Sequence, residues 1–241
     1  MTSLTPGVGC QEGGRRPLLI GGIQPFSTVD WPGKLACVAF LAGCPWRCPY
    51  CQNAALQTRE AATATDADLF RLLGARRGLL DGVVFSGGEP LAQAAVLDSM
   101  REAKEMGFEV GLHTCGAFPE RLLEALPYLD WVGLDVKAPW DAYDRVTRGH
   151  ASGKAALACL TAILDAGVAM EARTTWHPAL LSGEDIRTLG HDLAARGVTN
   201  WAVQAYRHIG TTGELPDETV YPSDVPEELP GLFEHYEFRR A

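Results

Sequence analysis

Short apolar runs alternate with amphipathic segments along most of this chain, and this alternation constrains the fold more than any other feature. Each apolar run is nearly continuous, as expected of a parallel strand that is covered on both faces. The six predicted strands span residues 35–40, 82–85, 108–112, 131–136, 170–175 and 201–206. A parallel sheet with a helix after each strand is therefore the expected α/β architecture.

The segments between the apolar runs carry signals for helix starts and helix ends. Thr65 with Asp68, and Ser182 with Asp185, have the spacing of a capping box ahead of apolar residues at helical intervals. A glycine also stands between a predicted helix and the next strand, as expected of a C-cap. Such glycines are Gly107, Gly167 and Gly197.

Six parallel strands can form either an open doubly wound sheet or a partial barrel. No G-x-G-x-x-G sequence opens a predicted helix, so the dinucleotide-binding type of sheet has no support. In a barrel, ligand-binding groups lie at the carboxyl ends of the strands. The polar residues described below follow predicted strands, which is compatible with a barrel.

Composition divides the chain into three parts. Residues 1–16 are rich in Gly, Thr and Pro without periodicity, which predicts a disordered lead-in. Residues 17–206 hold the βα units and form the predicted core domain. Residues 207–241 contain four prolines and many acids, which predicts an irregular C-terminal tail.

Composition also excludes several classes of protein. The net charge of −9 argues against a general nucleic-acid binder, which needs clustered Lys and Arg, and gives no reason to expect binding to an anionic membrane. No apolar run is long enough to span a bilayer. Seven cysteines in 241 residues are odd in number and too sparse for a disulfide scaffold, so we expect a cytoplasmic protein.

Three cysteines lie close together after the first predicted strand. Cys44, Cys48 and Cys51 have the spacing C-x3-C-x2-C, and the aromatic residue Tyr50 precedes the last of them. Thiolates are the expected ligands of iron–sulfur centres. Three of them can hold three corners of a cubane [4Fe-4S] cluster and leave the fourth iron open to a small molecule, and an open position allows catalysis at a metal.

Other kinds of site could use the same cysteines. A structural zinc ion could take Cys37 or Cys115 as its fourth ligand, although the chain has no second C-x2-C unit of the kind that zinc knuckles pair. Two disulfide partners and a spare thiol would suit a secreted protein. The spacing of Cys10, Cys37 and Cys159 suggests no ligation, and we treat these three as structural or incidental. We expect Cys115 to be a small buried or half-buried thiol.

The second predicted strand ends in the sequence Gly87-Gly88-Glu89-Pro90. Paired glycines let a backbone approach a ligand closely, and free carbonyl groups at a strand end can accept hydrogen bonds from an ammonium group. The same residues could equally form a tight βα turn. The cysteine loop and the Gly87–Pro90 segment, occurring in this order, are more specific together than either motif alone.

Together the two motifs resemble the radical S-adenosylmethionine superfamily, whose signature is this cysteine spacing with an aromatic residue in the place of Tyr50. The resemblance implies a partial (β/α)6 TIM-like barrel and a [4Fe-4S] cluster on the three cysteines. It also implies S-adenosylmethionine (SAM) as a second cofactor. The segment from Gly87 to Pro90 would then hold the methionine amino group.

The later strands end in further polar groups. Asp135 and Lys137 are two residues apart and so point the same way, where a zwitterionic ligand would satisfy both charges. A plain surface ion pair is the alternative. His113 could contact the ribose of a bound nucleoside, but a lone histidine is more often structural.

The Asp135-x-Lys137 segment closely resembles its counterpart in activating proteins of glycyl radical enzymes. Those proteins have an arginine in the place of Arg173 and a nucleoside-contacting residue near the place of Gln204. They commonly carry an acidic residue in the place of His113, where this chain departs from the pattern.

Residues 26–34 resemble the lead-in of activating proteins for anaerobic ribonucleoside-triphosphate reductase. The match continues through Asn53, although Gln52 stands where histidine is common, and it runs from about residue 22 to residue 206. Activating proteins of other glycyl radical enzymes often carry an inserted ferredoxin-like region with eight cysteines. This chain has no such region, so it resembles the activating proteins that lack the insertion. The resemblance implies that the partner is a glycyl radical enzyme, namely anaerobic ribonucleotide reductase. It also implies an electron donor such as flavodoxin or ferredoxin.

The expected activity is reductive cleavage of SAM and formation of a glycyl radical on the partner enzyme. No side chain need act as an acid or base, so none is predicted as catalytic. Two alternatives stay open: a related enzyme that acts on a small molecule or another peptide, and a non-catalytic iron–sulfur or zinc module. The predicted cofactor-binding residues are Tyr50, Asn53, Gly87, Gly88, Glu89, Pro90, His113, Asp135, Lys137, Arg173 and Gln204.

Overall fold

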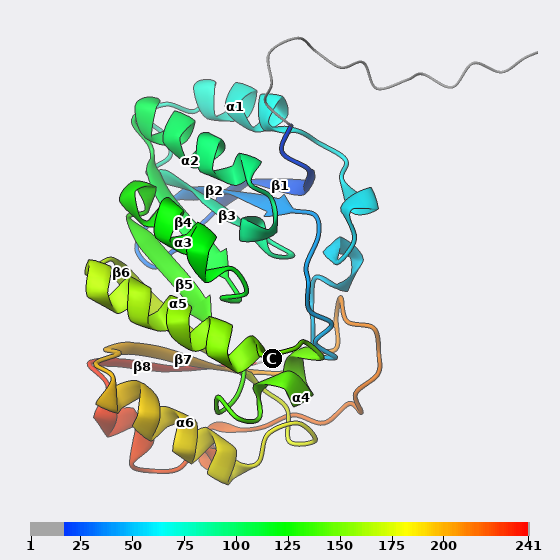
Figure 1. Cartoon of the computed structure of the whole chain (residues 1–241), viewed down its shortest axis with the longest axis vertical. Coiled ribbons are helices and arrows are strands. Elements are labelled where there is room, and N and C mark those ends of the chain that lie inside the picture. Colours follow the sequence, from blue (N-terminus) through cyan, green and yellow to red (C-terminus); the bar gives the residue numbers. More distant parts are fainter. Residues whose placement is uncertain (1–16, 241) are drawn as a thin grey trace, which may run out of the picture.

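The structure is a computed structural model that describes residues 17–240. Its eight strands form one curved sheet in chain order, from β1 to β8 (Figure 1). The first pair of strands is antiparallel, and every later pair is parallel. The strands are β1 Ile20–Ser27, β2 Ala36–Leu41, β3 Gly82–Gly87, β4 Glu109–Thr114, β5 Trp131–Asp135, β6 Ala169–Trp176, β7 Asn200–Ala205 and β8 His235–Arg239.

Helices follow the strands and lie along one side of the curved sheet (Figure 1). The α-helices are α1 Asp66–Gly74, α2 Ala95–Glu105, α3 Pro119–Ala125, α4 Tyr143–Thr147, α5 Ser152–Ala166 and α6 Gly183–Ala195. Short 3-10 turns span Ala54–Leu56, Arg59–Ala61, Pro90–Ala92, Leu126–Tyr128, Pro222–Asp224 and Leu229–Leu232. Two neighbouring parallel strands must be joined by a crossover connection, usually a helix, and this explains why strands and helices alternate along the chain.

The predicted helix signals are present in the structure. Thr65 and Ser182 are N-cap residues of α1 and α6, and each takes part in a capping box with the acid three residues later. The predicted C-cap glycines have positive φ angles of 90° at Gly107, 65° at Gly167 and 89° at Gly197. A residue without a Cβ adopts this conformation without strain.

The main core lies between the sheet and its helices. Phe85 and Leu112 of neighbouring strands are fully buried with Met100 of α2 and Leu122 of α3. Burial of one such side chain stabilises the fold by about 2 kcal/mol. This layer fixes the strands and hence the positions of the groups at their carboxyl ends.

A second, smaller cluster lies on the other face of the sheet. Trp31, in the connection from β1 to β2, packs on Val38, Val84 and Trp131. The rings of Trp31 and Trp131 stack with their centroids 5.7 Å apart. The connection between β1 and β2 is therefore anchored inside the curve of the sheet.

The six predicted strands correspond to β2 through β7, and the partial-barrel prediction is confirmed. The structure adds β1, which the sequence did not predict. Its segment includes Gly21, Gly22 and Pro25, and several of its side chains are partly exposed. An edge strand of this kind has no continuous apolar run by which to recognise it.

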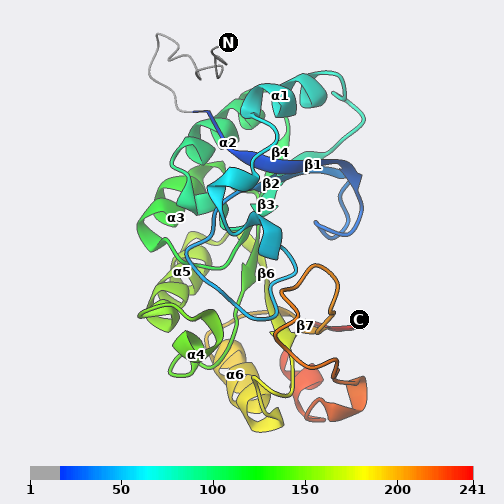
Figure 2. The same cartoon turned by 90° about the vertical axis from the view of Figure 1, so that its right-hand side faces the viewer.

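The C-terminal segment differs in part from the sequence prediction of an irregular tail. Residues 235–239 form β8, which pairs with β7 in parallel and has exposed or half-buried side chains. The segment just after β7, drawn in orange, runs beside the loop that follows β2 (Figure 2). There a Cβ added to Gly210 would lie 2.3 Å from the Gln52 carbonyl oxygen. The tail thus packs against the cysteine loop.

The predicted lead-in of residues 1–16 lies outside the described residues. Across residues 17–240, no helix combines the length and the apolar character needed to cross a membrane.

Candidate functional site

The three cysteines of the C-x3-C-x2-C motif line one cavity of about 150 Å³ at the carboxyl ends of the strands. The loop that carries them is held by backbone hydrogen bonds. The amide of Cys44 donates to the Gln57 carbonyl at 3.1 Å, and that of Cys51 donates to the Cys48 carbonyl, also at 3.1 Å. The amide of Arg47 donates to the Thr147 carbonyl of α4 at 2.9 Å. The thiols therefore project from a loop that both halves of the barrel support.

The thiols of the loop lie in different electrostatic surroundings. A hydrogen bond with the Cys115 thiol lowers the pKa of Cys44. Burial raises the pKa of Cys48 to about 11, although the nearby Lys137 ammonium opposes the rise. A bound metal must displace these protons, because only the thiolate is a strong ligand.

The other described cysteines separate into two groups. Cys115, at the end of β4, lines the same cavity as the loop cysteines. Cys37 and Cys159 do not line it, and burial raises the pKa of each to about 12. Cys37 is therefore not placed to be the fourth ligand of a zinc ion bound by the loop cysteines. Cys10 is outside the described residues.

Two glycines at the end of β3 form a wall of the cavity beside the cysteine loop. A Cβ added to Gly88 would lie 2.5 Å from the Gly43 carbonyl oxygen, and one added to Gly87 would lie 2.3 Å from the Leu41 amide nitrogen. Gly87 also has a φ angle of +110°. These glycines let β3 lie directly against the backbone of β2 and the cysteine loop. Asn53 strengthens the contact by donating from Nδ2 to the Gly87 carbonyl at 3.0 Å.

The next two residues of the motif lie behind this wall. Glu89 is fully buried, and its carboxylate accepts hydrogen bonds from the Thr114 hydroxyl and the backbone amides of Leu91 and Cys115. Burial raises the pKa of Glu89. Pro90 begins the turn that leads toward α2. Glu89 thus joins β3 to the end of β4, and neither residue lines any of the three cavities.

Asp135 and Lys137 both reach the cysteine cavity from the end of β5. The Lys137 Nζ lies 2.9 Å from the Asp135 Oδ2, and the lysine side chain is 9% exposed while the aspartate side chain is 45% exposed. Burial favours the neutral amine, but Asp135 and other nearby groups raise the pKa of Lys137 well above its ordinary value. The pair thus presents a buried ammonium group and a half-exposed carboxylate, which is more than a surface ion pair.

Tyr50 packs under this ion pair. Its ring is buried, and its centroid lies 5.6 Å from the Lys137 Nζ. Its hydroxyl is buried and has no hydrogen-bond partner among the described residues. A buried hydroxyl without a partner is uncommon and costs stability, which is typical of a side chain whose partner is a ligand.

His113 is held by the protein on both ring nitrogens. Its Nδ1 lies 3.0 Å from the Ser86 hydroxyl, and its Nε2 lies 2.7 Å from the Asp30 carbonyl oxygen. Burial and the Arg173 guanidinium lower the pKa of His113 to about 3, so the ring is neutral. With Nε2–H donating to Asp30 and Nδ1 accepting from Ser86, the ring anchors the loop between β1 and β2 rather than offering a free donor.

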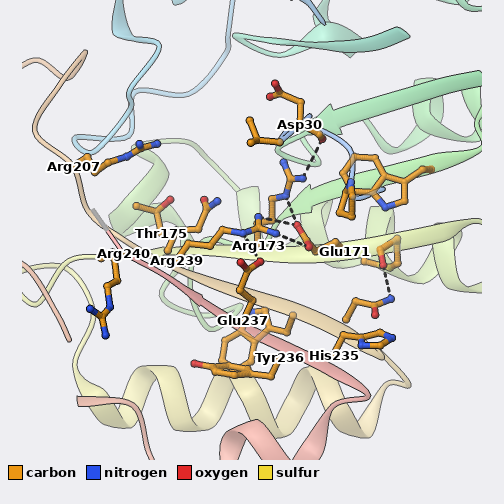
Figure 3. Close-up of a pocket in the computed structure, with 18 of the residues that line it drawn as sticks. Asp30, Glu171, Arg173, Thr175, Arg207, His235, Tyr236, Glu237, Arg239 and Arg240 are labelled. Atoms are coloured by element: carbon orange, nitrogen blue, oxygen red, sulfur yellow. Dashed lines mark hydrogen bonds and ion pairs between the residues drawn. The ribbon is translucent and has the colours of Figure 1, made fainter. Parts of the chain in front are cut away.

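A larger cavity of about 920 Å³ adjoins the cysteine cavity and shares Gln52, Thr175 and Gln204 with it (Figure 3). A third cavity of about 270 Å³ shares Asp30, Gln52 and Arg173 with the large one. The walls of the large cavity come from β6, β7, β8 and the loop between β1 and β2. Of its charged residues, Asp30, Glu171, Arg173, Arg207, Glu237, Arg239 and Arg240 are labelled in Figure 3.

Sequence reasoning missed part of this lining. Thr175 lies two residues after Arg173 in β6, so period-two alternation on a strand could have placed both in the same cavity. Nothing comparable pointed to Arg239 or Tyr236, because their strand was not predicted. Of the predicted cofactor-binding residues, the cavities bring together Tyr50, Asn53, Gly87, Gly88, His113, Asp135, Lys137, Arg173 and Gln204.

The residues present fit a [4Fe-4S] cluster and SAM by the chemistry of their donors. The three cysteines line one cavity together with Lys137 and with Tyr50, whose buried hydroxyl has no partner among the described residues. Thiolates suit iron–sulfur clusters, and a buried cation suits the carboxylate of an amino acid. Within residues 17–240, no three His, Cys, Asp or Glu side chains are arranged to hold a single metal ion.

Comparisons with known proteins agree with this donor set. The model of the Radical SAM superfamily matches residues 38–189. A protein of Methanocaldococcus jannaschii, provisionally named a glycyl-radical enzyme activating enzyme, is 34% identical over 178 residues, or 71% of this chain and 73% of that protein. The PqqA peptide cyclase of Streptomyces rochei is 41% identical over 76 residues, or 30% of this chain and 20% of the cyclase.

A solved structure shares the fold. Streptococcus suis SuiB, bound to the precursor peptide SuiA, has a TM-score of 0.63 and 14% identity, and the match covers 84% of this chain and 48% of SuiB. The chain thus spans about half the length of SuiB. The family match extends over most of the barrel and includes the cysteine loop, Gly87 and Asp135. The chain therefore belongs to the radical S-adenosylmethionine superfamily.

Proposed function

We propose that this protein is an activating enzyme that cleaves SAM reductively and generates a glycyl radical on a partner enzyme. The observation that carries the proposal is the polar cavity of about 920 Å³ that adjoins the cysteine cavity. Its volume lies within the range of ligand sites, so it leaves room for a group of a substrate beside the bound cofactor. The relative from Methanocaldococcus jannaschii supports the same class of activity.

In this proposal Cys44, Cys48 and Cys51 hold the [4Fe-4S] cluster. The bound cluster and SAM supply reductive cleavage of the sulfonium, which gives a carbon radical able to take a hydrogen atom from a glycine. Lys137 binds the SAM carboxylate, because it is a buried ammonium group beside the cysteines. Asp135 keeps that ammonium group charged and leaves a half-exposed carboxylate for a cationic group of the ligand.

Other residues of the chain define the shape of the site and exclude water from it. Gly87 and Gly88 present backbone at the wall, and Asn53 fixes the Gly87 carbonyl. Gln204 lies where the cysteine cavity meets the large cavity, and Arg173 lies where the third cavity meets it. Exclusion of water from these junctions would protect a radical from side reactions. No side chain is assigned as an acid or base.

The proposed partner is anaerobic ribonucleotide reductase, which the lead-in over residues 26–34 supports. A flavodoxin or ferredoxin is the proposed source of the electron. The predicted cytoplasmic location stays a prediction.

Anaerobic reconstitution with iron and sulfide tests the cofactor chemistry. The reduced protein with SAM should release 5′-deoxyadenosine, and Cys48→Ala should release none. Cys159→Ala is the matched control, because Cys159 is a buried cysteine outside the cavity and its variant should retain the activity. Four irons per chain without cleavage, or zinc in place of iron, would contradict the proposal and favour a non-catalytic module.

The partner requires a second measurement. An anaerobic ribonucleotide reductase incubated with the reduced protein and SAM should develop the electron paramagnetic resonance doublet of a glycyl radical. SAM cleavage without this signal would favour the alternative substrate class, another peptide. The local match to a peptide cyclase is the observation that keeps this alternative open. A mass change in a candidate peptide would then identify the substrate.

A further inference from the structure

We propose that Arg239, in the C-terminal strand β8, is a positioning residue that acts through Glu171 to hold the guanidinium of Arg173 at the cofactor site. This inference rests on the proposed function, because it takes Arg173 to face bound SAM. It assigns a role to a segment that the sequence predicts to be irregular.

Glu171 lies between the two arginines. Its carboxylate accepts a bidentate pair of hydrogen bonds from Arg239, with Nη1 at 3.0 Å and Nη2 at 2.8 Å. The same carboxylate accepts from the Arg173 Nε at 2.6 Å (Figure 3). The exposed fractions of the side chains are 12% for Glu171, 9% for Arg173 and 25% for Arg239. These are therefore largely desolvated, charge-assisted bonds, which are stronger than bonds in water.

The strand order explains why Arg239 can reach this carboxylate. Glu171 and Arg173 are two residues apart in β6 and so point to the same face of the sheet. Arg239 is the register partner of Gln204 in β7, the strand between β6 and β8. Its side chain crosses β7 to meet Glu171, while Glu237 accepts a hydrogen bond from its Nε at 2.7 Å.

The Nη atoms of Arg173 lie on the side of its guanidinium away from Glu171, and the residue lines the large and the third cavity. Its Nη1 lies 3.0 Å from the His113 Nε2, and its Nη2 donates to the Asp30 carbonyl at 3.4 Å. Its Cζ lies 5.0 Å from the centroid of the Trp131 ring. Glu171 thus holds the Nε while β4, β5 and the loop between β1 and β2 contact the two Nη atoms. A long side chain that is fixed in advance loses less entropy when a ligand binds.

Arg239 acts on Arg173 by orienting the carboxylate between them. It fixes the rotamer of Glu171 by a planar bidentate contact, so that the carboxylate stays aimed at the Arg173 Nε. Without Arg239, Glu171 would pair with Arg173 alone and could turn toward the large cavity.

Equilibrium binding of SAM to the reconstituted, unreduced holoprotein tests this proposal without turnover. Arg239→Met should raise the SAM dissociation constant about three- to tenfold, as expected for loss of an oriented charge-assisted contact. Glu171→Gln keeps the shape of the side chain and should have an effect in the same direction. The KM for SAM should rise more than kcat falls in both variants, since the residues position a binding group.

Arg187→Met is the matched control. Arg187 also binds two carboxylates, Glu228 at 2.7 Å and Glu184 at 2.5 Å, but it lies on the surface of α6. Its variant should bind SAM as the wild type does. This comparison separates the loss of any arginine–carboxylate pair from the loss of the pair that contacts Arg173.

A double-mutant cycle makes the test independent of general stability. If Arg239 acts through Arg173, Arg239→Met should add little to the effect of Arg173→Met. Additive effects on SAM affinity, or an unchanged affinity in folded Arg239→Met and Glu171→Gln, would overturn the inference while the proposed function stands. A wild-type holoprotein that fails to bind SAM would overturn both.

Discussion

The ammonium group of Lys137 lies over the ring of Tyr50, 5.6 Å from its centroid, and so joins the end of β5 to the cysteine loop. The same ammonium group is 2.9 Å from the Asp135 carboxylate. A desolvated cation near an aromatic face is attracted to the ring and held in place by it. The site therefore contains a fixed positive charge beside three thiols before any ligand binds.

Replacement of this charge should abolish tight binding of SAM. We expect Lys137→Met to raise the SAM dissociation constant about a hundredfold, since the buried carboxylate contact of the ligand loses its partner. Equilibrium dialysis of the reconstituted protein measures this change. The control is Lys34→Met, because Lys34 also pairs with a carboxylate at 2.7 Å but is 34% exposed and remote from the cavity. Equal SAM dissociation constants for Lys137→Met and Lys34→Met would show that Lys137 does not bind SAM.

Cluster assembly should depend on the absence of a side chain at position 88. Gly88→Ala would place a Cβ 2.5 Å from the Gly43 carbonyl oxygen, and backbone atoms of the cysteine loop would have to move. We expect at least a severalfold loss of iron and acid-labile sulfide per chain after reconstitution, because cluster ligands tolerate little displacement. Gly74→Ala is the control, since a Cβ there meets nothing within 4 Å. Normal iron content in Gly88→Ala would contradict this account of the wall.

The elements that the sequence predicts well are those with a local signal. Residues 82–85 form a continuous apolar run, and the run coincides with buried β3. Thr65 and Asp68 are three residues apart, and they form the predicted capping box. In both cases the residues that make the structure are neighbours in the chain, so one short window contains the whole pattern.

The parts that escaped the sequence depend on contacts between distant residues. Arg239 meets Glu171 because β8 lies one strand beyond β7, and no local pattern encodes that order. Cys115 reaches the cysteine cavity from the end of β4, whereas the sequence left it level with Cys37 as a possible companion of the loop cysteines. Similarly, the burial of Glu89 behind the wall follows from its bonds to Thr114 and Cys115 on the next strand.

Two buried tyrosines offer a matched test of the orphaned hydroxyl. The Tyr50 hydroxyl has no partner among the described residues, so Tyr50→Phe should leave the stability of the cluster-free protein unchanged or raise it by about 1 kcal/mol. The Tyr143 hydroxyl accepts from the Lys137 amide and donates to the Asp135 carbonyl, both at 3.0 Å. Tyr143→Phe should therefore lower the free energy of unfolding by about 1–3 kcal/mol. Urea denaturation measures both, and a larger loss in Tyr50→Phe would show that its hydroxyl has a partner.

His113 should make the stability of the cluster-free protein depend on pH. Burial and Arg173 lower its pKa from 6.5 to about 3, so the folded protein keeps the ring neutral while the unfolded chain binds a proton below pH 6.5. The contribution of the neutral ring is thus fully present above pH 6.5 and is lost as the pH falls toward 3. Between pH 7 and pH 5 the free energy of unfolding should fall by about 2 kcal/mol from this residue alone.

Urea denaturation at pH 7 and pH 5 isolates that contribution when the wild type is compared with His113→Phe. The variant lacks the titrating ring, so its free energy of unfolding should fall by less over the same interval, even if its stability at pH 7 is lower. His150→Asn, which removes an exposed histidine outside the cavities, is the control for loss of a histidine elsewhere in the chain. A wild-type slope equal to that of His113→Phe would mean that the pKa of His113 is the same in the folded and unfolded protein, so that the folded ring carries a proton at pH 5. Arg173 would then lie beside a second positive charge, and the contact of His113 with Ser86 would have to involve donation from the ring instead of to it.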